Sequence, residues 1–411
     1  MNYFFLFNKH NFTISLAIAL LIKVLSSCSN DNRPLNNNGN HVELHCLNCS
    51  KGSEPIDAHF PYNDVKMIKL ETTSDCLITH ILEIVMTDSL IFIRDQRDAL
   101  FLFNIEGNFI CQIGQKGQGP TEYITIDAFF INNNRVGIVD HYKERFLFYN
   151  FEGKFISSTE SKFEHLDRSN QALLTNNNQL LIHNDINFKD DNTAYRIIDM
   201  NTNQVIGNYY TYNPIKLDSY RHYFSNNAMA KSNDEIHFIM PLCDTIFSYA
   251  DSTFSVKYIV KTYDNIATKQ QIEYNTKDLN ADMRALLRQG YFTGFKTIFE
   301  TDNFIFLGFS VIIEGFFIFD KNSKEGYQYL YSYDDIMNEI PFFTIIGSQS
   351  NDKFIGFEIP ETLLMLTENA KWDNIYLMQL KEILDNSKED DNPILFIYEL
   401  KSLKNEYLEI N

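Results

Sequence analysis

The chain has 411 residues, enough to bury a sizeable core in one large domain or in two smaller ones. Phe and Tyr contribute 35 and 23 residues, an aromatic content that suits sheets packed face to face. Acidic residues outnumber basic ones by 54 to 35, and the formal charge of −19 argues against binding nucleic acid or anionic lipid through a general basic surface. Such a charge favours solubility, and cations or neutral ligands such as glycans.

The N-terminus has the pattern of a secretion signal. Lys9 supplies a positive flank, and residues 12–24 form an apolar stretch too short to span a bilayer, interrupted once by Lys23. The following Leu25-Ser26-Ser27-Cys28 resembles a bacterial lipobox, in which the cysteine becomes the acylated first residue. We therefore predict a lipoprotein signal peptide over residues 1–27 and lipidation of Cys28, with an ordinary signal peptide and a chance cysteine as the alternative.

Residues 28–63 are expected to form a flexible tether, because residues 29–40 are polar and rich in turn formers. Lipidation would place the protein at the cell envelope, anchored to the outer membrane without spanning it. Asp31 is a single acidic residue after Cys28, so it does not decide between the periplasmic and the surface face.

A lone C-x-x-C motif ends this tether, at Cys46 and Cys49. A structural zinc site would need two more ligands, which His41 and His45 could supply. In an oxidising compartment a local disulfide is favoured over zinc and over two idle thiols.

Residues 90–159 contain the same pattern twice, with an offset of about 46 residues. Each copy holds an apolar run ending in Asp, an aromatic-rich run ending in Asn, a Glu-Gly turn and a third apolar run. Repeated units of 40 to 50 residues made of short strands are typical of β-propeller blades. Gly107 and Gly153 should take the positive φ of a hairpin turn. Asp95 and Asp140 should cap the turns that follow them, a role favoured over catalysis or metal binding.

Several motifs resemble a known family. They are Ile68-Lys-Leu70-Glu71-Thr72-Thr73, the loop Gly117-Gln118-Gly119-Pro120 with Glu122-Tyr123, Cys243-Asp244-Thr245-Ile246-Phe247 and Asp391-Asn392-Pro393-Ile394-Leu395. Together they resemble the six-bladed β-propeller lipoproteins of gut Bacteroidetes, which are similar to NHL-type propellers. The resemblance implies an all-β, six-bladed β-propeller over residues 64–411 with an undefined molecular function. Thr121 departs from the family, which usually has Gly there.

The remaining blades are expected over residues 179–206, 228–260, 304–331 and 342–357 with the C-terminal strand. The strand that starts at Val65 should pair with residues 394–398, because joining the chain ends removes an open edge. His237 alternates with apolar neighbours and is interpreted as a satisfied side chain on a strand rather than a ligand.

Two short helical insertions are predicted, over residues 278–289 and 372–384. Arg284 and Arg288 share one side of the first helix, where a solvated face is favoured over a site for an acidic ligand. Both insertions could narrow the central channel and so create a pocket.

No G-x-S-x-G, H-E-x-x-H, P-loop or EF-hand pattern occurs in the sequence. The favoured function is a membrane-anchored scaffold that binds a glycan, a peptide or an envelope protein, with Gln118, Glu122 and Tyr123 as a candidate binding loop. The alternative is a polysaccharide-active hydrolase or lyase with its site at the propeller channel. We expect no cofactor, no metal site and no nucleic-acid partner, with Ca²⁺ as the one alternative ligand.

Overall fold

The computed structural model describes residues 41–47, 62–160, 169–184, 193–211, 227–240, 243–262, 292, 294–310, 314–330, 340 and 343–400. These residues form strands β1 to β25 and two short helices, α5 (Pro360–Leu366) and α6 (Ile375–Asp385). The fold class is therefore all-β, as predicted.

The first half of the chain forms three antiparallel four-stranded sheets, in each of which consecutive strands are neighbours. The first unit contains β3 (Ile81–Met86), β4 (Leu90–Asp95), β5 (Ala99–Asn104) and β6 (Phe109–Gln112). The second contains β7 (Ala128–Asn132), β8 (Arg135–Asp140), β9 (Arg145–Asn150) and β10 (Phe155–Glu160). The third contains β11 (Ser169–Leu174), β12 (Gln179–Asn184), β13 (Thr193–Asp199) and β14 (Gln204–Thr211).

The next two units are joined into one nine-stranded sheet. The fourth unit contains β15 (Met229–Ser232), β16 (Glu235–Ile239), β17 (Thr245–Ala250) and β18 (Thr253–Lys261). The fifth contains β19 (Phe295–Glu300), β20 (Phe304–Ser310), β21 (Glu314–Asp320) and β22 (Glu325–Leu330). Strand β1 (Val42–Cys46) joins them, because it pairs in parallel with both β18 and β22.

The sixth unit combines three strands from the C-terminal part of the chain with β2, the second strand of the chain. It contains β23 (Ile345–Gln349), β24 (Lys353–Glu358), β25 (Ile394–Leu400) and, at its outer edge, β2 (Tyr62–Lys69). β2 is antiparallel to β25, and Val65 lies opposite Tyr398. The predicted pairing of the chain ends is confirmed.

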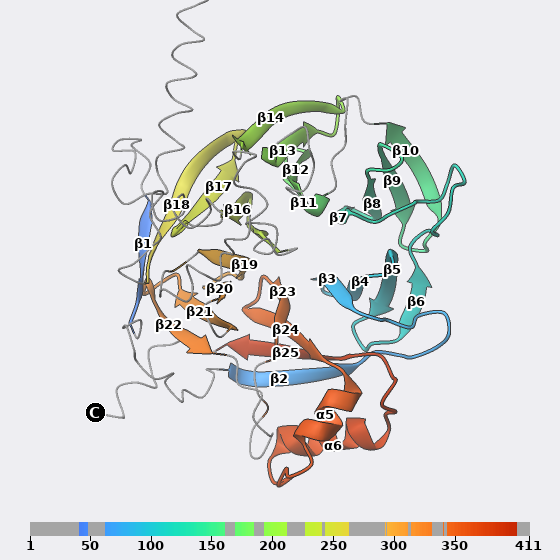
Figure 1. The fold of residues 1–411 in the computed structure, drawn as a ribbon, viewed down its shortest axis with the longest axis vertical. Coiled ribbons are helices and arrows are strands. Elements are labelled where there is room, and N and C mark those ends of the chain that lie inside the picture. The colour runs from blue at the N-terminus through green and yellow to red at the C-terminus, as the bar shows by residue number, and fades with distance from the viewer. Residues whose placement is uncertain are drawn as a thin grey trace, which may run out of the picture.

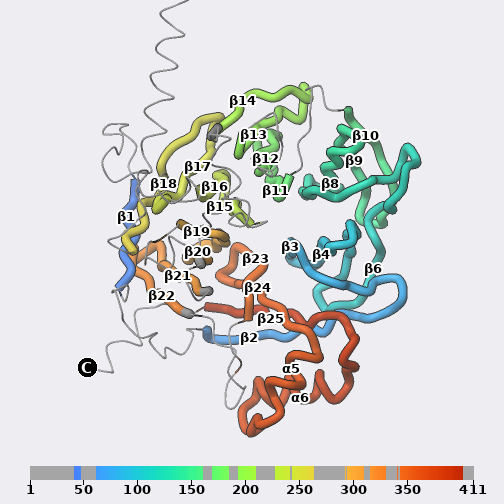
Figure 2. The backbone as a smooth tube through the Cα atoms, in the orientation of Figure 1, coloured from blue at the N-terminus to red at the C-terminus, as the bar shows by residue number. Residues whose placement is uncertain are grey.

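The sheets are arranged around a common centre (Figures 1 and 2). Strands β3, β7, β11 and β23 lie on the inside, whereas β6, β10, β14 and β22 lie on the outside (Figure 1). Helices α5 and α6 lie outside the sheets, beside β2 (Figure 1).

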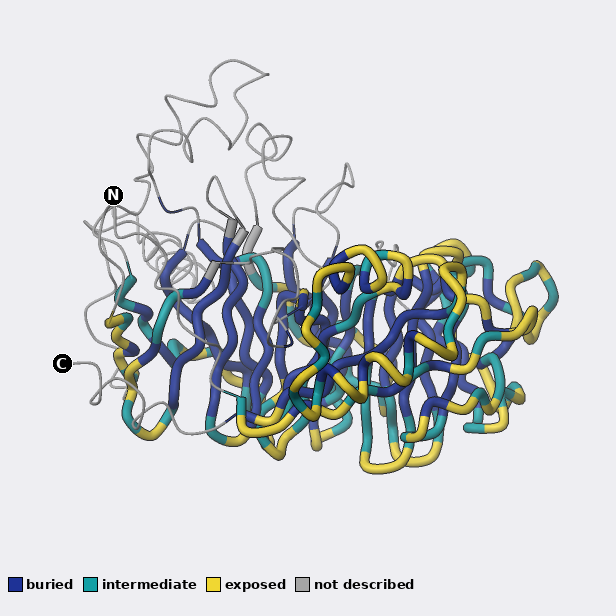
Figure 3. Tube along the Cα trace, turned by 90° about the horizontal axis from the view of Figure 1, so that it is seen from below, coloured by how far each residue is buried: buried dark blue, intermediate teal, exposed yellow. Residues whose placement is uncertain are grey.

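The core lies between neighbouring units. Phe92 of the first unit packs near Phe129 of the second, and Tyr195 of the third packs against Phe238 of the fourth. In side view the strands are mostly buried, and many of the exposed residues lie in the turns that join them (Figure 3). The turns therefore provide much of the surface on which a ligand could be recognised.

The repeated turns have the predicted conformations. Gly107 and Gly153 have φ of 88° and 76°, which glycine adopts without strain. Asp95 accepts hydrogen bonds from the backbone N–H groups of Thr79 and Arg97, at 2.6 and 2.8 Å. Asp140 accepts equivalent bonds in the second unit, from Ile124 at 2.7 Å and Lys143 at 3.2 Å. Each aspartate therefore fixes the segment that enters its unit to the turn that follows its second strand.

The tether prediction needs correction, and some other predictions fall on residues that the structure does not describe. The tether predicted over residues 28–63 is wrong in its described part, because Val42–Cys46 form β1 and bury Leu44 between two units, and β2 begins at Tyr62. The second predicted helix corresponds to α6, and α5 was not predicted. The first predicted helix, with Arg284 and Arg288, lies outside the described residues, as does Cys28.

Candidate functional site

A cavity of about 410 Å³ lies among the innermost strands. Five of the six units contribute to its lining, through residues that include Glu83, Gln171, Lys231, Glu300 and Ser348. Its position follows from the arrangement of the sheets, since the first strand of each unit faces the centre.

Several polar side chains in this lining connect neighbouring units. Gln171 of the third unit both donates to the carbonyl and accepts from the N–H of Met229, at 2.8 Å each. Ser348 of the sixth unit donates to the Glu300 carbonyl at 3.0 Å, and Gln349 donates to the Thr87 carbonyl of the first unit at 3.1 Å. These hydrogen bonds fix the cavity walls relative to one another.

Glu83 forms a buried ion pair with Arg94, with the Arg94 Nε 3.2 Å from its Oε2. Burial raises the pKa of Glu83 to about 7, although the Arg94 guanidinium favours the ionised form. Arg94 also donates to the carbonyls of Ile126 and Asp127 in the approach to the second unit, and of Asn170 in the third. One guanidinium thus connects three units.

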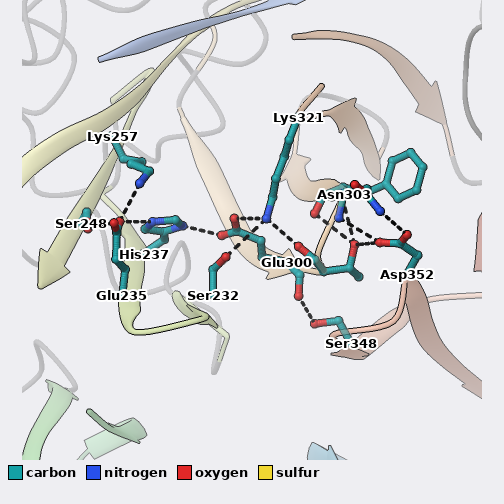
Figure 4. A network of polar contacts seen from close by, with 12 residues as sticks. Ser232, Glu235, His237, Ser248, Lys257, Glu300, Asn303, Lys321, Ser348 and Asp352 are labelled. Carbon is teal, nitrogen blue, oxygen red and sulfur yellow. Dashed lines mark hydrogen bonds and ion pairs between the residues drawn. The ribbon is translucent and has the colours of Figure 1, made fainter. Parts of the chain in front are cut away.

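A second polar network links the fourth and fifth units (Figure 4). His237 on β16 lies between two carboxylates, with Nδ1 2.5 Å from Glu300 Oε2 and Nε2 2.9 Å from Glu235 Oε2. Lys321 lies 2.6 Å from Glu300 Oε1, and Lys257 lies 2.8 Å from Glu235 Oε2. His237 is a satisfied strand residue, as predicted.

Burial and ion pairing shift the pKa values of His237 and Glu300 in opposite directions. Burial alone would lower the pKa of His237, but hydrogen bonds to Glu235 and Glu300 outweigh it and raise that pKa. Burial alone would raise the pKa of Glu300, yet His237 and Lys321 lower it. The hydrogen bond from His237 is the largest cause that lowers the pKa of Glu235. The network therefore holds opposite charges together between the fourth and fifth units.

A larger cavity of about 820 Å³ lies between the second and third units. We call it the asparagine groove, because its lining includes Asn132, Asn133, Asn134, Asn176, Asn178 and Asn201. Lys231 lines both this groove and the central cavity, so the two hollows adjoin. Sequence reasoning missed the groove, although three consecutive asparagines at 132–134 were a visible signal.

Three of these amides form a chain across the two units. Asn132 Nδ2 lies 3.5 Å from Asn178 Oδ1, and Asn178 Nδ2 donates to Asn201 Oδ1 at 2.7 Å. Asn133 occupies the tight turn between β7 and β8 with φ of 52°, a region that Asn tolerates well. Asn133 and Asn134 are exposed. These amides thus lie at the end of β7 and in the turns that join neighbouring strands.

The predicted binding loop lies at neither of these cavities. Tyr123 is fully buried, with its hydroxyl 3.2 Å from Gln112 Nε2, and burial raises its pKa to about 12. Glu122 is half-buried and accepts the Gly119 N–H at 2.8 Å. Gln118 is exposed. Tyr123 therefore supports the loop from within, and Gln118 is the member of the three most open to solvent.

Cys46 at the end of β1 is disulfide-bonded, so it cannot serve as a thiolate ligand of zinc. Its partner lies outside the described residues, as does Cys49. Cys76 and Cys111 are free thiols. Within the described ranges, no group of three or more His, Cys, Asp or Glu side chains could hold a metal ion.

Sequence comparison establishes the family. A model for a domain of unknown function, DUF4934, matches residues 48–399. The chain belongs to the DUF4934 family. No curated protein sequence matches this DUF4934 chain. Neither helix in the described part of it is long and apolar enough to cross a membrane.

Solved structures are similar to this chain to different degrees. A "Putative exported protein" from Bacteroides fragilis NCTC 9343 has 21% identity and a TM-score of 0.69, covering 88% of this chain and 99% of that one. A DUF4221 family member from Bacteroides vulgatus ATCC 8482 has 10% identity and a TM-score of 0.49, over 84% and 98% of the chains. The Pan2 WD40 domain of Neurospora crassa has 8% identity and a TM-score of 0.38, over 67% and 71%. The first match has the same overall fold as this chain, and it comes from Bacteroides.

Proposed function

We propose that this DUF4934 chain is a six-bladed β-propeller that serves as a binding module at the cell envelope, held there by a lipid on Cys28. The observation that carries the proposal is the pair of adjoining cavities that share Lys231, at the inner strands and turns of several sheets. Concave polar sites on rigid elements are where folds of this kind bind ligands.

The six-bladed interpretation has support in the sheet order. Every unit has four strands, the nine-stranded sheet consists of two such units plus β1, and β2 completes the unit that ends with β25. Exchange of strands between the chain ends is a general way to close a propeller.

Binding is favoured over catalysis because the two glutamates that line the central cavity are engaged in buried ion pairs. Glu300 is paired with His237 and Lys321, and Glu83 with Arg94. One observation favours the alternative, a hydrolase or lyase acting on polysaccharide. Glu83 lines the cavity with a pKa of about 7, which would suit a general acid.

The envelope location is supported by the signal pattern before Cys28 and by the description of the Bacteroides fragilis neighbour as exported. The anchor and the outer membrane are tested by fractionating Bacteroides cells that express the full chain or its Cys28→Ala variant. The wild type should partition with outer-membrane vesicles, and the variant should not. Equal partition of the two proteins would refute the lipid anchor.

Binding itself is tested with detergent-solubilised full-length protein. Thermal unfolding is followed against envelope glycans, peptides, Ca²⁺ and a chelator. A ligand present at about 100 times its Kd stabilises a protein by about 2.7 kcal/mol, which moves the melting midpoint measurably. The binding module would be refuted if no ligand class raised the melting midpoint and if no partner protein were recovered from envelope extracts.

A further inference from the structure

The asparagine groove has the composition of a site for an uncharged ligand. Its described lining contains six asparagines, one threonine, Arg135, Lys231 and three aliphatic residues, and none of these is acidic. The whole chain carries 54 acidic residues and a charge of −19, so this part of the surface differs from the rest. The described lining offers no carboxylate to a cation.

The amides match the chemistry of hydroxyl groups. An Asn side chain both donates and accepts hydrogen bonds, as does an alcohol, whereas carboxylates only accept and ammonium groups only donate. Asn178 uses one N–H on Asn201 and its oxygen lies near Asn132, so the amide planes are held in place before a ligand arrives. Asn134 is exposed at the rim. The groove thus presents several oriented donors and acceptors.

The two cationic side chains of the groove, Lys231 and Arg135, already contact other groups of the protein. Lys231 donates to the Leu174 carbonyl and to Asn176 Oδ1, at 3.0 Å each. Burial lowers its pKa. The Arg135 guanidinium lies 4.7 Å from the centre of the Phe148 ring, which holds it against an aromatic face. A ligand with many negative charges would therefore find few partners.

Aliphatic side chains supply the remaining surface. Ile131, Ile156 and Leu174 line the groove, and Ile156 is 51% exposed although it is a large hydrophobic residue. A sugar ring presents C–H groups on its faces and hydroxyls around its edge, which matches aliphatic patches flanked by amides. The volume of about 820 Å³ lies within the range of sites that hold ligands of several hundred daltons.

We propose that the asparagine groove binds a segment of a neutral, hydroxyl-rich oligosaccharide, with the amides of Asn132, Asn134 and Asn201 contacting its hydroxyls. The inference rests on the proposed binding function and names its ligand class and location. The proposed oligosaccharide site is therefore the asparagine groove and not the central cavity.

The test is calorimetric titration of full-length protein in detergent with the neutral hexasaccharides of glucose, xylose and mannose, and with hexagalacturonate as a charged comparison. At least one neutral hexasaccharide should bind, and more tightly than hexagalacturonate. The double variant Asn132→Leu with Asn134→Leu removes hydrogen bonding but keeps side-chain size. Loss of two hydrogen bonds should weaken binding about tenfold or more.

Asn108→Leu provides the matched control, because Asn108 is exposed in a tight turn of the first unit and lines neither cavity. It should bind as the wild type does, and all variants should keep the wild-type melting temperature. Should the double variant fail to fold, Ile156→Asp on the exposed face of β10 tests the same groove and should also weaken binding.

The outcomes separate this inference from the proposed function. Neutral binding that survives both groove variants would overturn the groove as its location while keeping the binding module. Binding of hexagalacturonate alone, or of only a peptide or protein ligand, would overturn the ligand class and again keep the module. Absence of binding by every ligand class would overturn both.

Discussion

Asn392 is the residue whose replacement tests the ring closure most sharply. It is 1% exposed and sits just before β25. Its Oδ1 accepts the Ile78 N–H at 2.7 Å, and its Nδ2 donates to the carbonyls of Glu71 at 2.7 Å and Cys76 at 2.8 Å. Its backbone N–H donates to Thr72 Oγ1 at 2.8 Å. One side chain thus fixes the segment between β2 and β3 to the last strand of the ring.

Asn392→Asp replaces the Nδ2 donor with an oxygen while keeping the shape of the side chain. The acceptor oxygen remains, but the two donated hydrogen bonds are replaced by a carboxyl oxygen that faces two carbonyl oxygens. Each buried carbonyl left unsatisfied costs about 1 to 3 kcal/mol, so the free energy of unfolding should fall by about 2 to 6 kcal/mol at pH 7.

The free energy of unfolding of this variant should also depend on pH. Burial against two carbonyls should raise the folded-state pKa of the introduced carboxyl above its unfolded value of about 3.9. A raised pKa contributes stability that is present below the unfolded value and lost as pH rises through the folded value. Between the two values the deficit relative to wild type should therefore grow by about 1.4 kcal/mol per pH unit.

The assay is denaturant unfolding of both proteins at pH 5 and pH 7. Asn108→Asp makes the same chemical change in an exposed turn and should stay within about 0.5 kcal/mol of wild type. The reasoning is refuted if Asn392→Asp is as stable as this control at pH 7, or if its deficit does not grow from pH 5 to pH 7.

Two further predictions concern the second network and the repeated turn. His237→Gln should destabilise the protein by about 1 to 3 kcal/mol at pH 6 and by less at pH 9, because the raised pKa of His237 makes its contribution present below about 6.5 and lost at higher pH. Equal denaturation midpoint shifts at the two pH values would contradict the charge pairing. Gly107→Ala should cost about 1 to 3 kcal/mol in chemical unfolding, since φ is 88° and a Cβ would lie 2.3 Å from the Lys69 carbonyl oxygen. A loss below about 0.5 kcal/mol would show that the turn adapts to a side chain.

The sequence predicted features that depend on local pattern. Gly107 and Gly153 repeat at the same place in two units, and Val65 and Tyr398 lie in strands at the ends of the chain whose pairing closes a ring. The apolar spacing around Leu377 and Leu380 likewise predicted α6, in which both are buried. In these cases the signal lies within a few residues or follows from a general rule of sheet closure.

Features that depend on distant partners were missed. β1 is a five-residue strand with one fully buried side chain, Leu44, and its partners β18 and β22 lie more than 200 residues away. Strand β11, with the sequence SNQALL, lacks clear alternation. The asparagines of the groove come from turns spread from residue 132 to residue 201, so the sequence shows these residues but not their proximity. Tyr123 was predicted to contact a ligand but is fully buried. The sequence pattern of an aromatic residue after a glycine-rich loop does not distinguish a core residue from a ligand-binding residue.

We propose above that this DUF4934 protein binds its ligand where the turns of the second and third units meet. The most direct measurement is photo-crosslinking of the tightest-binding neutral hexasaccharide, fitted with a photoreactive group, followed by mass spectrometry of the labelled peptides. We expect labels within residues 131–135, 174–178 and around Asn201, and unmodified hexasaccharide should compete with them. Competed labels confined to other parts of the ring, such as α5 and α6, would contradict this proposal.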